Sequence, residues 1–462
     1  MTGYPAPTAR FSPTARLSEG VAGWVDHYLL SGDPAEPCLH LGEPVNRHHL
    51  RRLVDDRRQQ LAAVGLTAGG TVALRLPPSL DYVTTLLAAW RLGAQVALLD
   101  HRLTLAETER ALHRLRPQYL IGPESVEPLT DGQPATSAHV LVQLSSGSTG
   151  PSKVIARTSA DLVRELDCYR QLAHYPGRGE RIVLLASMVH VLGLVGGLLH
   201  SLRSGLELVV PQRLTPPGIL AAVRAAEVPT TLLGVPFYAE LLARMAQPPP
   251  TPQLVRMIVA GELVRPSVPA AFAARYGVPL GTMYGMTEIG VIATDLTGEL
   301  YPSVRPVAGM RAELIDGELH LAQPESPYLG LTDPGRWSDG LLHTRDAADL
   351  DRTTGLITVR GRQDSQVSIG GLKVDLTEVE QTLAALPGVR EAVVAFADGA
   401  IEAYAAADTT AELLRAELAG QLAGYKLPRR LTLLPALPRT ATGKVLRDAQ
   451  ALRAAAAAVH PS

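Results

Sequence analysis

Two spacings of apolar residues alternate along the first part of the chain. Between Arg51 and Ile121, segments with apolar residues at helical spacing, such as LRRLVDDRRQQLAAVG and LDYVTTLLAAWRLG, are separated by short apolar runs such as TVALRL and AQVALL. The helical spacing predicts amphipathic helices, and the short runs predict buried strands. Strands and helices that alternate in this way favour parallel α/β layers.

The same alternation resumes beyond residue 154 and changes character after Gly317. RIVLLAS, LELVVP, TTLLGVP and VRMIVAG predict four more buried strands, whereas ELHLA, GLITVRGR and QVSIGG predict a smaller antiparallel unit. In the last hundred residues, LTEVEQTLAAL and AELLRAELAGQL predict helices, and REAVVAFA and AIEAYAAA predict a strand pair. We therefore expect an α/β protein: a large N-terminal domain of layered sheets and helices, residues 1–363, and a small mobile C-terminal α+β domain, residues 364–462.

Composition and charge narrow the class of protein. The 462 residues suffice for two or three domains, and 43 Lys+Arg against 45 Asp+Glu leave a net charge of −2, which gives no reason to expect nucleic acid or an anionic membrane as partner. Two cysteines are too few for a disulfide framework and suit a reducing cytosol. The N-terminal segment lacks the apolar core of a signal peptide, and Met188–Leu199 is too short to span a bilayer. We expect a cytoplasmic protein.

The segment LSSGSTGPSK, from Leu144 to Lys153, carries the strongest chemical signal. Glycines let backbone amides approach a ligand closely, and hydroxyl groups and a lysine donate to phosphate oxygens. The pattern GxxxxGK[ST] is absent, so this is not a Walker loop. A Ser/Gly linker is the alternative, but the segment lies between the apolar run HVLVQL and the helical pattern VIARTSADLVREL. We predict a polyphosphate-binding loop made of Ser145, Ser146, Gly147, Ser148, Thr149, Gly150 and Lys153.

This loop and five later motifs resemble those of the adenylate-forming superfamily, which comprises acyl-CoA synthetases, peptide-synthetase adenylation domains and luciferases. In order, the later motifs are YGMTE from Tyr284, GELHLAQP from Gly317, HTRD from His343, VRGRQDSQVSIGGLKVDLTEVE from Val359 and LPRTATGKVLR from Leu437. Two positions depart from the family pattern. The loop ends in Gly-Pro-Ser-Lys where the family has Gly-x-Pro-Lys, and Arg345 replaces a glycine, which leaves open either unusual backbone angles or a new phosphate contact.

The resemblance implies that the chain uses ATP and Mg²⁺. It implies that Thr287 contacts the α-phosphate, that Glu288 holds Mg²⁺ and that Lys444 bridges the substrate carboxylate and the α-phosphate as a catalytic residue. Asp364 occupies the family's hinge position. The other residues that the resemblance assigns to ATP binding are Gly261, Glu262, Tyr284, Gly285, Asp346 and Arg362. For each of these residues, an ordinary turn or surface role is the alternative.

The resemblance also locates an acyl pocket. His190 matches the aromatic gate of a Phe-His-x-x-Gly segment, a position that takes part in catalysis. Val191 stands where adenylation domains for α-amino acids have an aspartate, and an ammonium group facing valine would lose its partner. We therefore predict a small aliphatic or aromatic acid without an α-amino group. The remaining pocket residues are apolar or small: Gly193, Val235, Ala260, Gly261, Met283, Met286 and Ile292. Glu262 either pairs with a distal amine or caps a helix at the surface.

The acceptor of the acyl group is left open at this stage. Gly370 and Gly371 resemble the glycines along which pantetheine passes, which implies CoA or the phosphopantetheine arm of a free-standing carrier protein. Lys426, Arg429 and Arg430 either meet the phosphate of CoA or an acidic carrier, or form a solvated basic run. We predict an AMP-forming acid–thiol ligase. The alternatives are a ligase that uses free CoA only, an amide-forming ligase, and a non-catalytic nucleotide-binding homologue.

Overall fold

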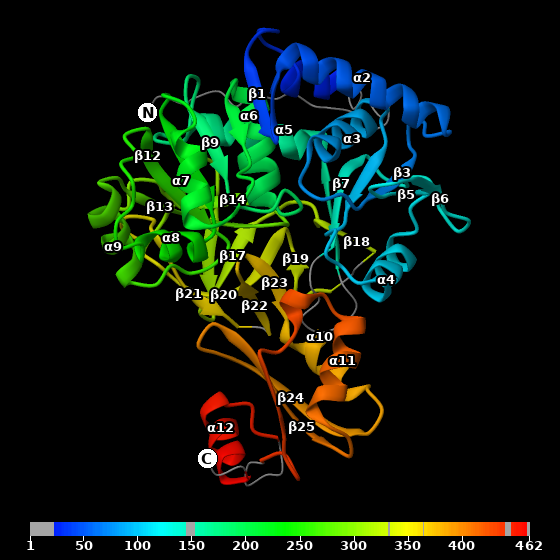
Figure 1. Ribbon diagram of the computed structural model, residues 1–462, viewed down its shortest axis with the longest axis vertical. Coiled ribbons are helices and arrows are strands. Elements are labelled where there is room, and N and C mark those ends of the chain that lie inside the picture. The colour runs from blue at the N-terminus through cyan, green and yellow to red at the C-terminus, as the bar shows by residue number, and fades with distance from the viewer. Residues whose placement is uncertain (1–22, 145–152, 331–332, 364, 439–444, 460–462) are drawn as a thin grey trace.

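The computed structural model describes residues 23–144, 153–330, 333–363, 365–438 and 445–459. Figure 1 shows a large body that contains the two long sheets, with the C-terminal residues in a smaller body below it. The apolar core of the large body lies between the two sheets, where Trp90, Leu166 and Leu198 pack together with residues of both. Among the described residues, no helix combines the length and hydrophobicity needed to cross a bilayer.

The larger sheet has nine strands in the described chain, in the order β15-β14-β13-β12-β11-β9-β10-β1-β2. Neighbouring strands from β13 through β12, β11, β9 and β10 to β1 are parallel, as expected of buried apolar runs joined by helices. The strand bounds are β1 (Pro37–Leu41), β2 (Glu43–Asn46), β9 (Arg181–Leu184), β10 (Glu207–Val209), β11 (Thr230–Gly234), β12 (Leu254–Ala260), β13 (Leu280–Met286), β14 (Gly290–Asp295) and β15 (Arg305–Pro306).

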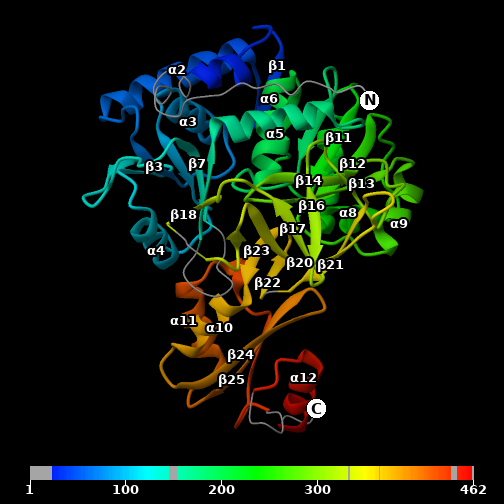
Figure 2. The same ribbon diagram turned by 180° about the vertical axis from the view of Figure 1, so that it is seen from behind.

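The second sheet has seven strands within the described ranges, in the order β18-β8-β7-β4-β3-β5-β6. Its bounds are β3 (Thr71–Leu74), β4 (Gln95–Leu98), β5 (Tyr119–Ile121), β6 (Val126–Pro128), β7 (His139–Leu144), β8 (Val154–Thr158) and β18 (Tyr328–Leu329). Seen from behind, helix α5 runs across the upper body beside β7 and β14 (Figure 2). The helices of the upper body are η1 (Val25–Leu29), α2 (Arg47–Ala63), α3 (Leu80–Arg91), α4 (Leu105–Leu115), α5 (Ser159–Gln171), η2 (Leu192–Leu199), α6 (His200–Ser204), α7 (Pro216–Arg224), α8 (Pro236–Ala243) and α9 (Ser267–Tyr276).

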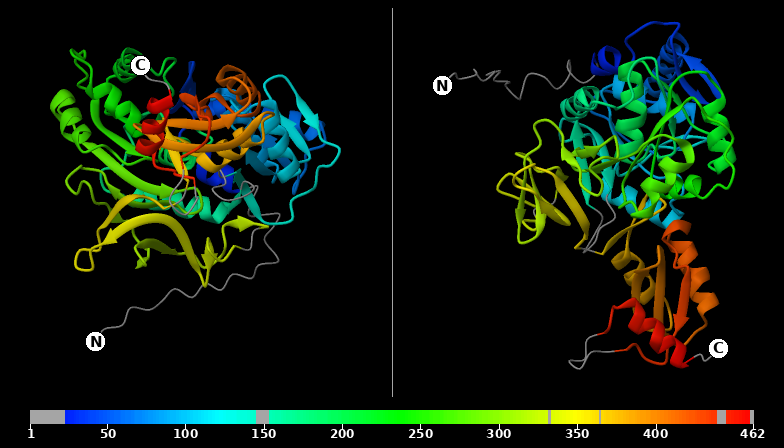
Figure 3. Two further views of the ribbon diagram at one scale, coloured as in Figure 1. Left: turned by 90° about the horizontal axis from the view of Figure 1, so that it is seen from below. Right: turned by 90° about the vertical axis from the view of Figure 1, so that its left-hand side faces the viewer.

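A third, antiparallel sheet stands to one side of the upper body, in the right-hand view of Figure 3. It contains β16 (Ala312–Ile315), β17 (Glu318–Ala322), β19 (Trp337–Ser338), β20 (Leu341–Leu350) and β21 (Ile357–Arg362). Beyond it follow a hairpin and a small α+β unit. Their elements are β22 (Gln366–Ile369), β23 (Leu372–Asp375), α10 (Leu376–Ala384), β24 (Val389–Ala397), β25 (Ala400–Ala407), α11 (Ala411–Gln421), η3 (Gly424–Lys426), β26 (Arg430–Leu433) and α12 (Ala449–Val459).

The predicted fold class is confirmed. The four apolar runs after residue 154 form β9, β10, β11 and β12. Of the three runs predicted after Gly317, ELHLA and GLITVRGR form β17 and β21 of the antiparallel third sheet, whereas QVSIGG forms β22, which pairs with β23 in a separate antiparallel hairpin. The second part of the apolar segment Met188–Leu199 forms a largely buried π-helix, η2 (Leu192–Leu199). A side chain at Gly193 would collide with the backbone of Ser187, so this helix needs glycine to pack where it does.

Candidate functional site

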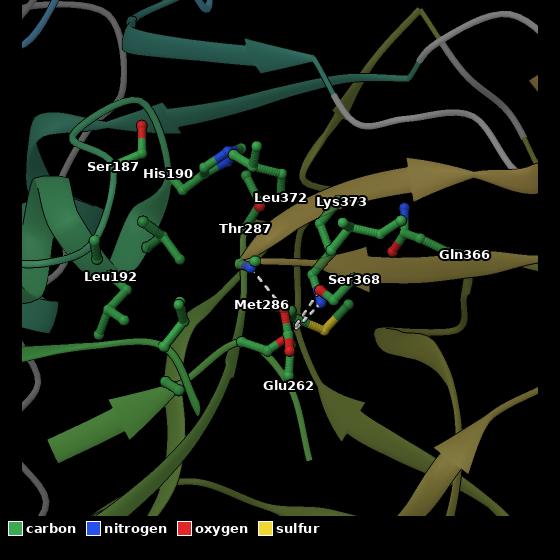
Figure 4. A pocket seen from close by; sticks show the side chains of 18 of the residues that line it. Ser187, His190, Leu192, Glu262, Met286, Thr287, Gln366, Ser368, Leu372 and Lys373 are labelled. Carbon is green, nitrogen blue, oxygen red and sulfur yellow. Dashed lines mark hydrogen bonds between the residues drawn. The ribbon is translucent and has the colours of Figure 1, made fainter. Parts of the chain in front are cut away.

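A cavity of about 2010 Å³ lies where the carboxyl ends of β11, β12 and β13 face the hairpin β22–β23. The carboxyl ends of parallel strands are where α/β sheets usually bind ligands. Figure 4 shows that its lining comes from segments distant in sequence, including His190, Glu262, Thr287 and Lys373. The cavity therefore joins the loops of the large sheet to the first hairpin of the C-terminal region.

One end of the cavity carries groups suited to phosphate. Thr287 and Glu288 lie in the turn between β13 and β14, and Lys153 directly precedes β8 and lines the same cavity. The hydroxyl of Tyr328 donates to Glu288 Oε1 at 3.1 Å, and burial together with that carboxylate raises the pKa of Tyr328. The predicted loop residues Ser145, Ser146, Gly147, Ser148, Thr149 and Gly150 lie outside the described residues, as do Asp364 and Lys444.

Asp346 is held between two other predicted ATP-binding residues. The Tyr284 hydroxyl donates to Asp346 Oδ2 at 2.5 Å, and Arg362 Nη1 donates to Asp346 Oδ1 at 3.1 Å. Arg362 stands opposite Asp346 across the β20–β21 pair, while Tyr284 comes from β13 of the large sheet. Burial, and then the Asp346 carboxylate, raise the pKa of Tyr284. The arrangement fixes an almost fully buried carboxylate, 5% exposed, at the wall of the cavity. Gly285, the next residue of β13, also lines the cavity.

Arg345 adopts left-handed backbone angles and is not among the residues that line the cavity. Its φ is +60°, a region in which a residue with a side chain is strained. Its backbone N–H donates to Glu318 Oε1 at 2.9 Å, and its guanidinium contacts Glu318 Oε2 at 3.4 Å and the carbonyl of Gly335. The sequence left open either unusual backbone angles at Arg345 or a new phosphate contact. The structure shows the unusual backbone angles, and the guanidinium contacts Glu318.

The acyl end of the cavity is mostly apolar. His190 Nε2 is buried and has no hydrogen-bond partner among the described residues. Burial lowers the pKa of His190 to about 4, so this imidazole is neutral at neutral pH. The other predicted pocket residues that line the cavity are Val191, Val235, Ala260, Gly261, Met283 and Met286.

Two residues predicted for the pocket lie elsewhere. Ile292 is fully buried in the core under the third sheet, because it alternates on β14 with Val291, which faces the cavity. Gly193 does not line the cavity and instead packs against the Ser187 backbone. The prediction of both as pocket residues is therefore wrong. A shift of one residue along a strand exchanges its two faces, which motif spacing alone does not resolve.

Glu262 binds the hairpin of the C-terminal region. Its Oε1 accepts the backbone N–H of Gly371 at 2.6 Å, and Lys373 Nζ donates to the neighbouring carbonyl of Gly261 at 2.6 Å. Helix α9 starts later, with Pro266 as its N-cap, so Glu262 does not cap it. Gly371 has a φ of +83°, and any side chain there would collide with Val235. Gly370 and Gly371 both line the cavity, where the thiol arm was predicted.

Lys426 does not belong to a surface basic cluster. Its Nζ forms ion pairs with Glu107 Oε1 at 2.7 Å and Glu378 Oε2 at 3.0 Å, and the side chain is only 8% exposed. The interpretation of Lys426 as a contact for the phosphate of CoA or for a carrier protein is therefore wrong. Arg429 and Arg430 remain exposed. Lys373 and Glu318 were not singled out from the sequence, although both lie within the quoted motifs.

Comparison with protein-family models shows to which family the chain belongs. Residues 34–143 and 128–330 match the family model of the AMP-binding enzymes, and residues 378–444 match that of the AMP-binding enzyme C-terminal domain. The chain belongs to the AMP-binding enzyme family. The resemblance to adenylate-forming enzymes is thereby confirmed.

Relatives and solved structures agree with this family. The chain is 29% identical over 342 residues to a benzoate–CoA ligase of Thauera aromatica, with 67% of this chain and 65% of that protein covered. It is 26% identical over 489 residues to a p-hydroxybenzoic acid–AMP ligase of Mycobacterium tuberculosis, with 93% and 66% covered. The chain thus spans about two thirds of the length of these relatives. The structure of an amide bond synthetase from Marinactinospora thermotolerans, 23% identical, covers 92% of this chain and 98% of its own with a TM-score of 0.80, which shows a shared fold.

Proposed function

We propose that this AMP-binding enzyme is an AMP-forming acid–thiol ligase that activates a small aliphatic or aromatic carboxylic acid without an α-amino group. The main observation in support of this proposal is that one cavity joins a polar end, with Asp346 and Glu288, to an apolar end, with Val191 and Met283. Such a cavity accommodates a nucleotide and an acyl group side by side. We further propose a domain boundary at residues 363–364, with the cavity at the junction.

In the first half-reaction, a carboxylate oxygen of the acid attacks the α-phosphorus of ATP, and pyrophosphate leaves. Asp346, oriented by Tyr284 and Arg362, is proposed to accept the ribose hydroxyls. Thr287 is proposed to donate to the α-phosphate, and Lys444 to stabilise the developing charge. The loop from Ser145 to Lys153 is proposed to hold the remaining phosphates.

Glu288 fits a role in holding Mg²⁺. This ion usually takes one or two carboxylate ligands together with phosphate oxygens, and Glu288 is a carboxylate at the cavity wall whose position is fixed by Tyr328. When bound, Mg²⁺ would neutralise part of the charge of the triphosphate. Among this chain's own residues, Lys153, which directly precedes β8, would share that task.

In the second half-reaction, a thiol sulfur attacks the acyl carbonyl carbon and AMP leaves. Gly370 and Gly371 lie in the hairpin that closes the acyl end, and their lack of side chains leaves room for a narrow arm. We propose CoA or the phosphopantetheine arm of a free-standing carrier protein as the thiol. Neutral His190 lies at the acyl end, where it is proposed to gate access for this arm.

Pyrophosphate exchange into ATP, dependent on an added carboxylic acid, tests the proposal. A panel of short aliphatic, benzoic, β-amino and α-amino acids should give exchange with an aliphatic or aromatic acid and none with α-amino acids. Lys444→Ala should abolish exchange and still bind ATP, whereas Arg429→Ala, an exposed control, should behave as wild type. Exchange with α-amino acids would overturn the substrate class. Binding of ATP without exchange for any acid would support a non-catalytic homologue.

A further inference from the structure

Three side chains of the kinds that ligate metals, Glu318, His320 and His343, gather on one face of the third sheet, and none of them has a role in the proposed reaction. Glu318 and His320 are two residues apart on β17, so their side chains project from the same face. His343 stands directly opposite His320 in the antiparallel pair with β20. One ligand atom from each residue lies within 4.8 Å of those of the other two. The intervening leucines, Leu319 and Leu342, face the core instead.

The cluster is buried and incompletely satisfied. Glu318 and His320 are each 7% exposed, and His320 Nδ1 is buried with no hydrogen-bond partner among the residues that the structure describes. A buried polar atom left unpaired costs about 1–3 kcal/mol. The two imidazole rings lie 4.4 Å apart between centroids, and His320 Nε2 is 3.9 Å from Glu318 Oε1. The Nε2 nitrogen of His320 thus lies near the Glu318 carboxylate, and its other ring nitrogen, Nδ1, is left without a partner among the described residues.

The surroundings of the cluster resemble the supports of metal ligands. His343 Nε2 lies 3.1 Å from Ser338 Oγ, which suits a ligating histidine whose second ring nitrogen is held by a hydrogen bond. Glu318 accepts the backbone N–H of Arg345 at 2.9 Å, but a carboxylate has about four acceptor sites and retains room for an ion. The Arg345 guanidinium is 3.4 Å from Glu318 Oε2, a long contact that an incoming cation would displace.

We propose that Glu318, His320 and His343 bind one divalent transition-metal ion, of which Zn²⁺ is the representative. Two imidazoles and a carboxylate form the donor set that suits Zn²⁺ and its neighbours, whereas Mg²⁺ prefers oxygen ligands. Typical Zn–N bonds of about 2.1 Å require the three donors to close inward slightly. His343 also lines the large cavity, which gives the ion a route from solvent. The site is separate from Glu288 and does not depend on the proposed reaction.

The consequence of this site concerns the strand that carries Asp346. His343 and Asp346 both lie on β20, three residues apart, whereas Glu318 and His320 lie on the neighbouring strand β17. A bound ion would cross-link the two strands just before Asp346. The expected result is a higher melting temperature in the presence of Zn²⁺, since a ligand that binds the folded state stabilises it.

Equilibrium dialysis of the tag-free, chelator-treated full chain against Zn²⁺, with Mg²⁺ in excess, tests the site. We expect about one Zn²⁺ per chain, and a visible Co²⁺ absorption band typical of nitrogen ligation. His320→Phe keeps an aromatic ring in the buried position, and His343→Gln changes the half-buried member. Each should weaken binding at least about tenfold. His49→Ala removes an exposed histidine of α2 and should bind as wild type.

Folding of the variants is checked by their circular dichroism and melting temperature without metal. If His320→Phe unfolds, Glu318→Gln serves in its place, because its amide keeps the shape of the carboxylate. Retention of wild-type Zn²⁺ affinity by both His343→Gln and Glu318→Gln would overturn the proposal. So would wild-type protein that binds no Zn²⁺, or Zn²⁺ that is released by Mg²⁺.

Discussion

The buried Lys426 ion pairs predict a measurable loss of stability when the lysine is removed. Lys426 lies in η3 of the C-terminal region, and its partner Glu107 lies in α4 of the upper body. Their side chains are 8% and 4% exposed, and the second partner, Glu378, is 28% exposed. Lys426→Met keeps most of the aliphatic stem but leaves Glu107 as a buried carboxylate without its cation. The two bodies should therefore separate more readily.

The expected size follows from the cost of an uncompensated buried charge. Removing one partner of a buried pair typically costs about 3–5 kcal/mol. Since Glu378 is partly exposed and regains water, we place Lys426→Met at the lower end, about 3 kcal/mol, for the transition that separates the C-terminal region. Glu107→Gln should cost less, because Lys426 keeps Glu378 and glutamine can replace Glu107 in the capping box with Thr104.

A double-mutant cycle by urea unfolding measures this coupling. Lys426→Met combined with Glu107→Gln leaves no buried charge at position 107. The double variant should therefore lose less unfolding free energy than the two single variants lose together. Arg429→Met, an exposed change on the same unit, is the matched control and should stay within about 0.5 kcal/mol of wild type. The reasoning is refuted if Lys426→Met behaves like Arg429→Met, or if the two single effects simply add.

The raised pKa of Lys426 also predicts how the stability lost in Lys426→Met varies with pH. Burial alone would lower the pKa of Lys426, but the carboxylates of Glu378 and Glu107 outweigh it and raise the pKa. A lysine with a raised pKa contributes its full stabilisation below its unfolded pKa of about 10.4 and loses it only as pH rises through the folded value. The difference between wild type and Lys426→Met should therefore be equal at pH 7 and pH 9.

Three further predictions follow from single contacts. Asp346→Asn should raise the KM for ATP at least about tenfold in pyrophosphate exchange, and Tyr284→Phe should raise it less, because Arg362 still orients the carboxylate; an unchanged KM in both variants would contradict a ribose contact. Val191→Asp should admit an acid that carries an α-ammonium, seen as new exchange activity with α-amino acids, and persistent silence would show that position 191 does not face the ammonium. Burial lowers the pKa of His200 from 6.5 to about 4, so that the unfolded state binds a proton at a higher pH than the folded state does. The free energy of unfolding should therefore fall by about 3 kcal/mol as the pH drops from 6.5 to 4. His200→Phe should flatten that part of the pH profile of unfolding, and an unchanged slope would exclude His200 as its source.

The fold could be predicted from the sequence where local pattern decides the structure. TTLLGVP became β11 because a short apolar run between helices has few other ways to bury itself. The order of the strands within each sheet could not be predicted from the apolar pattern. β1, near the N-terminus, pairs with β10, at residues 207–209, and no apolar run specifies its neighbour in a sheet. The close approach of Gly193 in η2 to the Ser187 backbone was likewise not predictable, since it depends on how the chain packs in three dimensions.

The candidate site was predictable as a set of residues but not as a set of contacts. The motifs identified Tyr284 and Asp346, yet the hydrogen bond between them joins residues 62 positions apart and follows only from how the sheets meet. Ile292 was misplaced because the two faces of a strand differ by a single step. Lys426 was misplaced because a lysine is a surface residue unless a specific partner is known, and Glu107 lies more than 300 residues earlier.

The contacts of the C-terminal region also determine what the acyl pocket is. Gly371 and Leu372 of the hairpin line the same cavity as Val191 and Val235, and Glu262 holds that hairpin through the N–H of Gly371. One wall of the pocket is therefore supplied by residues beyond 364, and its position depends on Glu262 and, further away, on the Lys426 ion pairs. A substitution that frees the C-terminal region removes this wall along with the stability. The choice of acid should consequently respond to changes at Glu262 and Lys426 as well as to changes at Val191, although neither of the first two residues lies at the apolar end.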